Sequence, residues 1–235
     1  MLPPALLVDL DDTVLDFGGA APIVWRELAG HFAPRVGIDA PDLVSGVQAA
    51  ASAFWADSAR AARGRLDLVA SRREIVRAAF GALGLEAPAL AREMADGFTR
   101  ERDARIRVFP GAVEALETLR ARGVALALVT NGSGEAQRAK LVRFDLARHF
   151  DAILVEGEFG VGKPDLAIYV EALRSLRAEP AQAAMVGDNL EWDVAAPQRL
   201  GLRGIWIDHA GDGLPADAPA RPDRIVRALS ELVSP

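Results

Sequence analysis

Two patterns of apolar residues alternate along the chain and predict two kinds of structure. Short, continuous apolar runs, which are typical of strands buried in a parallel sheet, occupy residues 5–8, 124–129, 152–155, 183–186 and 204–207. Apolar residues at spacings of three and four instead predict helices over residues 112–122, 134–144, 165–176, 194–200 and 224–232. The regular alternation of these strands and helices indicates parallel strands joined by helical crossovers.

The segment that follows the first strand has a different pattern. From Phe17 to about Arg105 helical spacing predominates, over residues 20–32, 42–63, 68–83 and 89–102, with glycine and proline between the helices. No strand is predicted there. We therefore expect an α/β fold whose Rossmann-like, doubly wound parallel sheet is formed by residues 1–16 and 106–235. Residues 17–105 are expected to form an inserted all-α cap domain.

Composition narrows the possible functions. The 235 residues carry a formal net charge of −6, which gives nucleic acid or an anionic membrane no basic surface to bind. The absence of cysteine excludes disulfides and thiolate metal sites. Neither a signal peptide nor an apolar run long enough to span a bilayer is recognisable, so we expect a cytoplasmic protein, monomeric or homodimeric. Lys140 and Lys163 are the only lysines of the chain, and its other positively charged residues are arginines.

Polar residues follow four of the predicted strands, where ligands of open parallel sheets bind. They are Asp9, Asp11, Thr130, Asn131, Lys163, Asp188 and Asp193. Each short pattern is common on its own, but together and in this order they indicate one site. Crowded carboxylates repel one another unless a cation lies among them, and oxygen ligands without histidine or cysteine favour magnesium. Asp9 and Asp11 are two residues apart at a strand end and can point the same way, one as a nucleophile and one as a proton donor.

With these residues the chain resembles the haloacid dehalogenase superfamily over nearly its whole length. Residues 9–13 resemble the first motif of that family, Asp-x-Asp-x-Thr. Thr130 resembles the second motif, which is a Thr or Ser at the end of the next core strand. The third motif is matched by Lys163, and the fourth, Gly-Asp with a further Asp five residues on, by Asp188 and Asp193. The helical insert resembles the small cap of subfamily I.

The resemblance implies a phosphatase mechanism with an aspartyl-phosphate intermediate. Asp9 would attack phosphorus, and Asp11 would protonate the leaving alcohol and then activate water. Thr130 and the amide of Asn131 would hold phosphate oxygens, and Lys163 would balance charge between Asp9 and the phosphate. The substrate implied is a small phosphorylated metabolite, such as a nucleoside monophosphate, a sugar phosphate or phosphoglycolate.

The same resemblance implies a bound Mg²⁺. Its ligands would be the Asp9 carboxylate, the main-chain carbonyl of Asp11 and Asp188, with Asp193 as an indirect ligand or an anchor behind them. Two departures from the usual pattern occur: Glu156 stands where a small hydroxyl residue is frequent, and Leu166 stands where proline is common. Neither residue is one of the expected catalytic groups.

Alternative reactions within the same superfamily receive different support. Dehalogenases lack the second aspartate of the first motif, so Asp11 argues against that activity, and phosphonate cleavage needs a lysine that the cap lacks. A phosphomutase remains open, because it uses the same core residues with a second phosphate site in the cap. A non-catalytic binding member also remains open. A phospho-receiver module is disfavoured, because the aspartate that is phosphorylated in such modules follows the third strand, and no such residue is present here.

Overall fold

The computed structural model describes residues 2–234 and divides the chain into two compact units. One unit is built from the residues up to Asp16 together with those from Arg107 onward. The other is continuous and comprises Phe17–Ile106. The second unit is therefore an insertion into the first, made between the first strand of the sheet, Ala5–Val8, and the next strand of that sheet, Ala125–Thr130.

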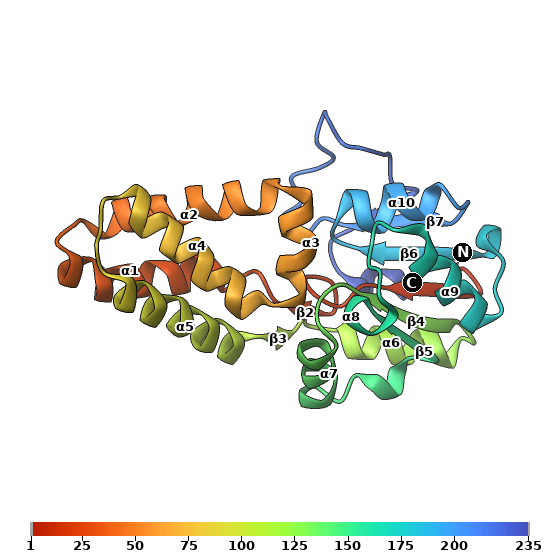
Figure 1. The fold of residues 1–235 in the computed structure, drawn as a ribbon. Coiled ribbons are helices and arrows are strands. Elements are labelled where there is room, and N and C mark those ends of the chain that lie inside the picture. Colours follow the sequence, from red (N-terminus) through yellow and green to blue (C-terminus); the bar gives the residue numbers. More distant parts are fainter. Residues whose placement is uncertain (1, 235) are drawn as a thin grey trace. The chain divides into compact units, whose positions relative to one another are not determined.

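The first unit contains a parallel sheet of six strands in the order β5-β4-β1-β6-β7-β8 (Figure 1). The strands are β1 (Ala5–Val8), β4 (Ala125–Thr130), β5 (Ala152–Val155), β6 (Ala183–Gly187), β7 (Arg203–Ile207) and β8 (Arg224–Val226). Leu7 of β1 pairs with Ala127 on one side and Met185 on the other. Because both faces of the central strands are covered, these strands are apolar at nearly every position. The expected α/β fold is confirmed.

The chain builds the sheet outward from β1 in two directions. It first adds β4 and β5 on one side, and then returns across β1 to add β6, β7 and β8 on the other. Crossovers between parallel strands are right-handed, so this reversal places the connecting helices on opposite faces. The helices of this unit are α6 (Ala112–Ala121), α7 (Gly134–Arg143), α8 (Glu156–Phe159), α9 (Leu166–Leu176) and α10 (Ala196–Gln198), with a π-helix at Leu190–Ala195 and 3₁₀ turns at Ala147–His149, Pro180–Gln182 and Leu229–Leu232. The reversal makes the carboxyl ends of β4, β1 and β6 the place where a ligand is expected.

A hydrophobic cluster joins α9 to the middle of the sheet. Tyr169 of α9 is fully buried with Leu7, Val129 and Met185 of the central strands. The helix begins where the Asp165 side chain accepts the amide of Ala167, which fixes its first turn. The packing of α9 therefore sets the position of the segment that precedes it, which contains Lys163.

The inserted unit is all-helical, as predicted. Its helices are α1 (Ala21–Val36), α2 (Ala40–Ala56), α3 (Ser58–Leu66), α4 (Leu68–Ala82) and α5 (Pro88–Arg105). They enclose their own apolar core, in which Phe32, Phe80 and Met94 are almost fully buried. The single helix expected over residues 42–63 is interrupted at Asp57, because this residue is extended and its carboxylate caps α3 by accepting the amide of Arg60.

Two short strands lie where the chain leaves and re-enters the first unit. Leu15 and Asp16 of β2 (Leu15–Asp16) pair antiparallel with Val108 and Arg107 of β3 (Arg107–Val108). The amide of Phe109 also donates to the carbonyl of Val14. The two connections to the insertion thus run side by side.

The prediction of a helix over residues 224–232 was wrong. Residues Arg224–Val226 form β8, which pairs in parallel with β7, and only Leu229–Leu232 turns as a short 3₁₀ helix. Ile225 and Val226 are β-branched and favour a strand, and the edge of β7 supplies the partner that the sequence pattern cannot show. An apolar run this short does not distinguish a strand from a helix by periodicity alone.

Candidate active site

The residues expected to form a site are brought together at the carboxyl edge of the central strands. Asp9 and Asp11 follow β1, and Thr130 is the last residue of β4. Asp188 follows β6, and Asp193 lies in the π-helix after it. Since β1 lies between β4 and β6, these segments end beside one another.

Lys163 forms the buried centre of the cluster. Its Nζ lies 2.7 Å from Asp9 Oδ1 and 2.7 Å from Asp193 Oδ1, and the side chain is almost fully buried. Burial by itself would lower the pKa of the Lys163 ammonium, but the carboxylates of Asp193 and Asp9 outweigh burial and raise that pKa above its ordinary value. The ammonium therefore stays charged between the two aspartates.

Asn131 fixes the main chain of Lys163 on both sides. Its Oδ1 accepts the Lys163 amide at 2.8 Å, and its Nδ2 donates to the Lys163 carbonyl at 2.8 Å. Gly162 lies so close that a Cβ there would come 2.6 Å from Asn131 Oδ1 and 2.6 Å from Glu156 Cδ. The side chain of Asn131, whose amide is expected to hold a phosphate oxygen, thus also fixes the loop that carries Lys163.

Glu156, one of the two departures from the family pattern, supports the same loop. Its Oε2 accepts the amide of Gly132 at 2.9 Å, and the residue is buried. The contact ties the turn after β4 to the start of α8. Glu156 therefore takes part in the architecture around the site, through the turn that follows Thr130 and Asn131.

Asp9, Asp188 and Asp193 form a crowded group of three carboxylates. One oxygen each from Asp9, Asp188 and Asp193 lies within 4.8 Å of the others. Burial is the main cause that raises the pKa of Asp9; Asp193 raises it further, and Lys163 opposes the rise. The pKa of Asp188 is also raised, first by burial and then by the charges of Asp9 and Asp193. This arrangement has more negative charge than one lysine balances.

These donors fit a hard divalent cation. All are carboxylate oxygens, which Mg²⁺ and Ca²⁺ prefer, and a cation among them would relieve the repulsion that raises the pKa of Asp9 and Asp188. Asp193 has both oxygens engaged, because Oδ1 contacts Lys163 and Oδ2 accepts the amide of Asn189 at 3.0 Å. Asp9 and Asp188 are therefore the more available ligands of the three.

Two residues of α7 that the sequence did not identify also contact the cluster. Lys140 Nζ lies 2.8 and 2.6 Å from the two carboxylate oxygens of Asp11. Gln137 Nε2 donates to Asp11 Oδ2 at 3.1 Å and to Thr130 Oγ1 at 2.6 Å. The available signal was that Lys140 is one of two lysines and lies three residues after Gln137, on the same helical face.

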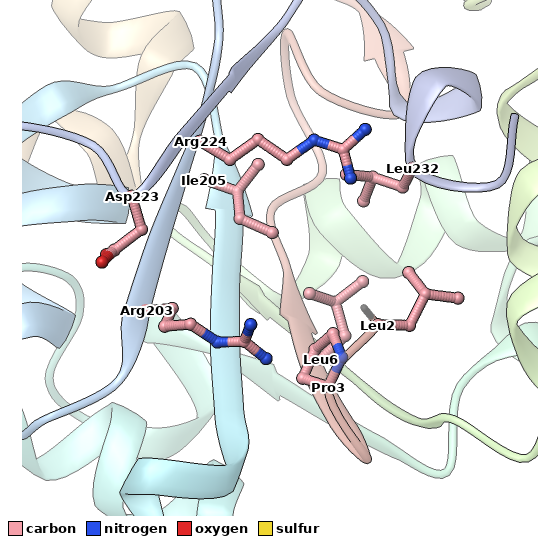
Figure 2. A pocket seen from close by; sticks show the side chains of 8 residues that line it. All are labelled: Leu2, Pro3, Leu6, Arg203, Ile205, Asp223, Arg224 and Leu232. Atoms are coloured by element: carbon pink, nitrogen blue, oxygen red, sulfur yellow. The ribbon is translucent and has the colours of Figure 1, made fainter. Parts of the chain in front are cut away.

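A pocket elsewhere in the first unit is unrelated to this cluster. It has a volume of about 190 Å³ and lies beside the amino-terminal ends of β1, β7 and β8 (Figure 2). Its lining residues are Leu2, Pro3, Leu6, Arg203, Ile205, Asp223, Arg224 and Leu232. None of the expected site residues is among them, because the expected site is at the opposite, carboxyl edge of the same strands.

The sheet and its buried cluster define the class of the protein: a parallel α/β enzyme with a carboxylate-centred site at the carboxyl edge of its central strands. A family model described as haloacid dehalogenase-like hydrolase matches residues 3–201. The chain belongs to the haloacid dehalogenase-like hydrolase family. The resemblance to this family is thereby confirmed, as is the expectation of a hydrolase.

Individual relatives agree with this assignment. A phosphoserine phosphatase of Thermus thermophilus is 38% identical across 97% of this chain and 96% of its own length. A 2-haloacid dehalogenase structure from Pseudomonas syringae shares 29% identity with a TM-score of 0.63, covering 99% of this chain and 97% of that one. The putative hydrolase YfnB of Bacillus subtilis, solved with magnesium, has a TM-score of 0.73 at 22% identity and shares the fold, covering 97% of this chain and 96% of that one. Within residues 2–234, no helix is long and apolar enough to cross a membrane.

Proposed function

We propose that this chain is a magnesium-dependent phosphatase that hydrolyses a small phosphorylated metabolite through an aspartyl-phosphate intermediate on Asp9. The observation that carries the proposal is the buried contact of Lys163 with Asp9, 2.7 Å, at the carboxyl end of the central strand, with Asp11 two residues further on. The phosphoserine phosphatase relative, which matches nearly the whole chain, supports the same reaction class.

In the first step the Asp9 carboxylate attacks phosphorus. A bond forms between an Asp9 oxygen and phosphorus, and the bond from phosphorus to the leaving oxygen breaks. Lys163 holds Asp9 Oδ1, which orients the carboxylate. Asp11 donates its proton to the leaving oxygen, so that an alcohol departs rather than an alkoxide.

In the second step water replaces the aspartate. Asp11, now a carboxylate, takes a proton from the water as its oxygen attacks phosphorus. The bond between Asp9 and phosphorus breaks, inorganic phosphate leaves, and both carboxyl groups return to their initial state. Asp11 loses one proton to the departing alcohol in the first step and gains another from water in the second, so its protonation state is restored.

The phosphate oxygens are held by Thr130, Lys163 and the main-chain amide of Asn131. Gln137 donates to Thr130 Oγ1, so the hydroxyl hydrogen of Thr130 is available for an acceptor. Its 3.4 Å contact to the Asn131 carbonyl is long and easily exchanged for a phosphate oxygen. Fixed donors of this kind stabilise charge on a transferring phosphoryl group, which is most of what such a reaction requires.

A magnesium ion would be held by the Asp9 carboxylate, the main-chain carbonyl of Asp11 and Asp188. When bound, it supplies positive charge that offsets the negative charge of the phosphate and lets the phosphate approach the carboxylates. Asp193, whose oxygens hold Lys163 and the Asn189 amide, anchors the cluster from behind. Asp9 and Asp188 are thus the carboxylates that remain available to the ion.

The test is phosphate release from a panel of phosphorylated metabolites and an aryl phosphate, led by O-phosphoserine because of the relative's activity. Wild type and Asp9→Asn are compared with magnesium and with a chelator. We expect release that needs the metal and becomes undetectable in Asp9→Asn, because uncatalysed monoester hydrolysis is slower by up to about 10²¹-fold. Release that persists in Asp9→Asn would show that Asp9 is not the nucleophile.

A further inference from the structure

The geometry points to Lys140, assisted by Gln137, as a positioning residue that holds the Asp11 carboxylate where it exchanges a proton with the substrate. This inference rests on the proposed function, in which Asp11 serves as the acid and base. It concerns a residue with no place in the motifs of the sequence analysis. Lys140 acts through Asp11 and is assigned no contact with the substrate.

The contact engages both oxygens of Asp11. Lys140 Nζ is 2.8 Å from Oδ1 and 2.6 Å from Oδ2, and Gln137 adds a bond of 3.1 Å to Oδ2. Lys140 is 9% exposed and Gln137 is 2% exposed, so water screens the interaction little. Lys140 provides the two short contacts, and the contact of Gln137 is longer because its amide also donates to Thr130 Oγ1 and to the Asn131 carbonyl at 2.9 Å. Held in this way, the Asp11 side chain has little freedom to rotate, and in its protonated form it keeps the contact with Lys140 through the oxygen that carries no proton.

The helix that carries both side chains begins beside the site. Ser133, three residues after the end of β4, caps α7 by accepting the amide of Ala136 with its side chain. Gln137 and Lys140 are three residues apart on this helix and therefore share one face. The end of β4 thus fixes Thr130 and, through α7, the two groups that hold Asp11.

Gln137 also connects the proton donor to a phosphate-binding group. Its Nε2 contacts Asp11 Oδ2 at 3.1 Å and Thr130 Oγ1 at 2.6 Å. The side-chain amide thereby fixes the spacing between Asp11 and Thr130. Since a displacement of about 1 Å in an active site can cost about 10²-fold in rate, this spacing matters for catalysis.

The distribution of charge argues against a purely structural role for Lys140. The chain has only two lysines, and each contacts an aspartate of the first motif: Lys163 contacts Asp9, and Lys140 contacts Asp11. Arg138, an arginine on the same helix, forms an exposed ion pair with Glu158 instead. An ammonium is a compact charge, whereas guanidinium is a wide planar fork, so lysine suits the enclosed position next to Asp11.

The test uses substrates that need proton donation to different degrees. An alkyl phosphate such as O-phosphoserine expels a poor leaving group and depends on Asp11, whereas p-nitrophenyl phosphate expels a stable phenolate and needs little help. We expect Lys140→Met to lower kcat/KM for the alkyl phosphate about 10- to 100-fold, yet to leave it within about threefold for the aryl phosphate. Lys140→Arg, which keeps the charge, should recover part of the alkyl activity.

Two further variants control the interpretation. Arg138→Met removes a cation from the same helix without touching the site and should change neither kcat/KM value. Asp11→Asn should show the same selective loss as Lys140→Met but larger, and Lys140→Met added to Asp11→Asn should cost nothing more, because Lys140 acts through Asp11.

The outcomes separate this inference from the proposed function. Equal losses for both substrates, no loss for either, or a full further loss on the Asp11→Asn background would overturn the positioning role while leaving the phosphatase intact. If Lys140→Met fails to fold, Lys140→Arg decides: an equal loss on both substrates overturns the role, and a selective loss supports it. A wild type without phosphate release, or an active Asp9→Asn, overturns the proposed function and this inference with it.

Discussion

Lys163 is a charged side chain that the fold removes almost entirely from water. Its ammonium lies 2.7 Å from a carboxylate oxygen of Asp9 and 2.7 Å from one of Asp193, and its main chain is clamped by Asn131. A buried ion pair adds little net stability compared with apolar packing, but loss of one partner is costly because the other charge is left unpaired. The main effect of Lys163 is therefore to balance the charge of Asp9 and Asp193 rather than to add net stability.

Replacement of Lys163 by methionine tests this view through stability rather than activity. We expect Lys163→Met to lower the free energy of unfolding of the metal-free protein by about 3–5 kcal/mol at neutral pH, because two carboxylates lose their counter-charge. Without the ammonium the folded pKa of Asp9 rises further above its unfolded value. A carboxyl group of this kind destabilises the fold only above the unfolded pKa, so the deficit should shrink as the pH falls to about 5.

The measurement is urea unfolding of both proteins at the two pH values. Arg138→Met is the matched control, since its exposed ion pair with Glu158 should contribute little. A deficit that stays constant or grows on acidification would mean that unpaired carboxylates are not its cause.

At the scale of secondary structure, the end of β6 and the π-helix after it fit together without spare room. Gly187 is the last residue of β6, and a Cβ there would overlap the carboxylate of Asp193. The side chain of Asp193 is fully buried and engages both Lys163 and the Asn189 amide. The absence of a side chain at position 187 thus allows Asp193 to reach Lys163.

We expect Gly187→Ala to displace Asp193 and so to impair both activity and stability. Overpacking of this kind costs about 1–3 kcal/mol, and the shift of Lys163 should lower kcat by about 10-fold or more. Gly30→Ala is the matched control: position 30 is exposed within α1 with nothing within 4 Å of an added Cβ. That change should stabilise by about 0.5–1 kcal/mol and leave kcat unchanged. Normal activity in Gly187→Ala would show that Asp193 can move without consequence.

Elements with a strong local sequence pattern could be predicted from the sequence. Elements whose structure depends on a contact with another part of the chain could not. The buried strands are apolar runs bounded by turn residues, so β1, β4, β5, β6 and β7 were predicted within a residue or so. β8 was mistaken for a helix because its strand character depends on the exposed edge of β7. The break between α2 and α3 depends on one capping carboxylate, Asp57.

The same distinction applies to the candidate site. Residues that directly follow strands could be identified, because parallel strand ends share one edge, and Lys163 indeed contacts Asp9 and Asp193. Gln137 and Lys140 lie on a helix more than 120 residues from Asp11 in the sequence, 126 and 129 positions away. Which face of that helix meets the site is decided by tertiary packing, which no local pattern records.

For the molecule as a whole, each compact unit has a separate core. The sheet and α9 enclose one apolar cluster, and the helices of the insertion enclose another, centred on Phe80 and Met94. The chain enters the insertion after β2 and leaves it before β3, and these two short strands pair with each other. Asp9, Asp188 and Asp193 all belong to the first unit, so the energetic effect of their crowding should appear in the stability of that unit.

Magnesium should stabilise the protein, and more so at higher pH. Burial and neighbouring carboxylates raise the folded pKa of Asp9 and Asp188 above the ordinary value of 3.8. Groups with raised folded pKa values cost nothing below their unfolded pKa, destabilise increasingly as the pH rises from the unfolded to the folded value, and cost a constant amount above it. The metal-free protein should therefore lose stability between about pH 4 and about pH 8. The ion binds the deprotonated carboxylates, and at about 100 times its Kd it would add about 2.7 kcal/mol.

Thermal unfolding with and without magnesium at about pH 5.5 and about pH 8 measures this linkage. The rise in Tm on adding the metal should be several degrees at the higher pH and much smaller at the lower one, where protons compete for the same oxygens. Asp188→Asn should abolish the rise, and in the metal-free state at the higher pH it should be more stable than wild type, because one of the crowded charges is gone. A rise that is independent of pH, or that survives in Asp188→Asn, would place the magnesium on other groups.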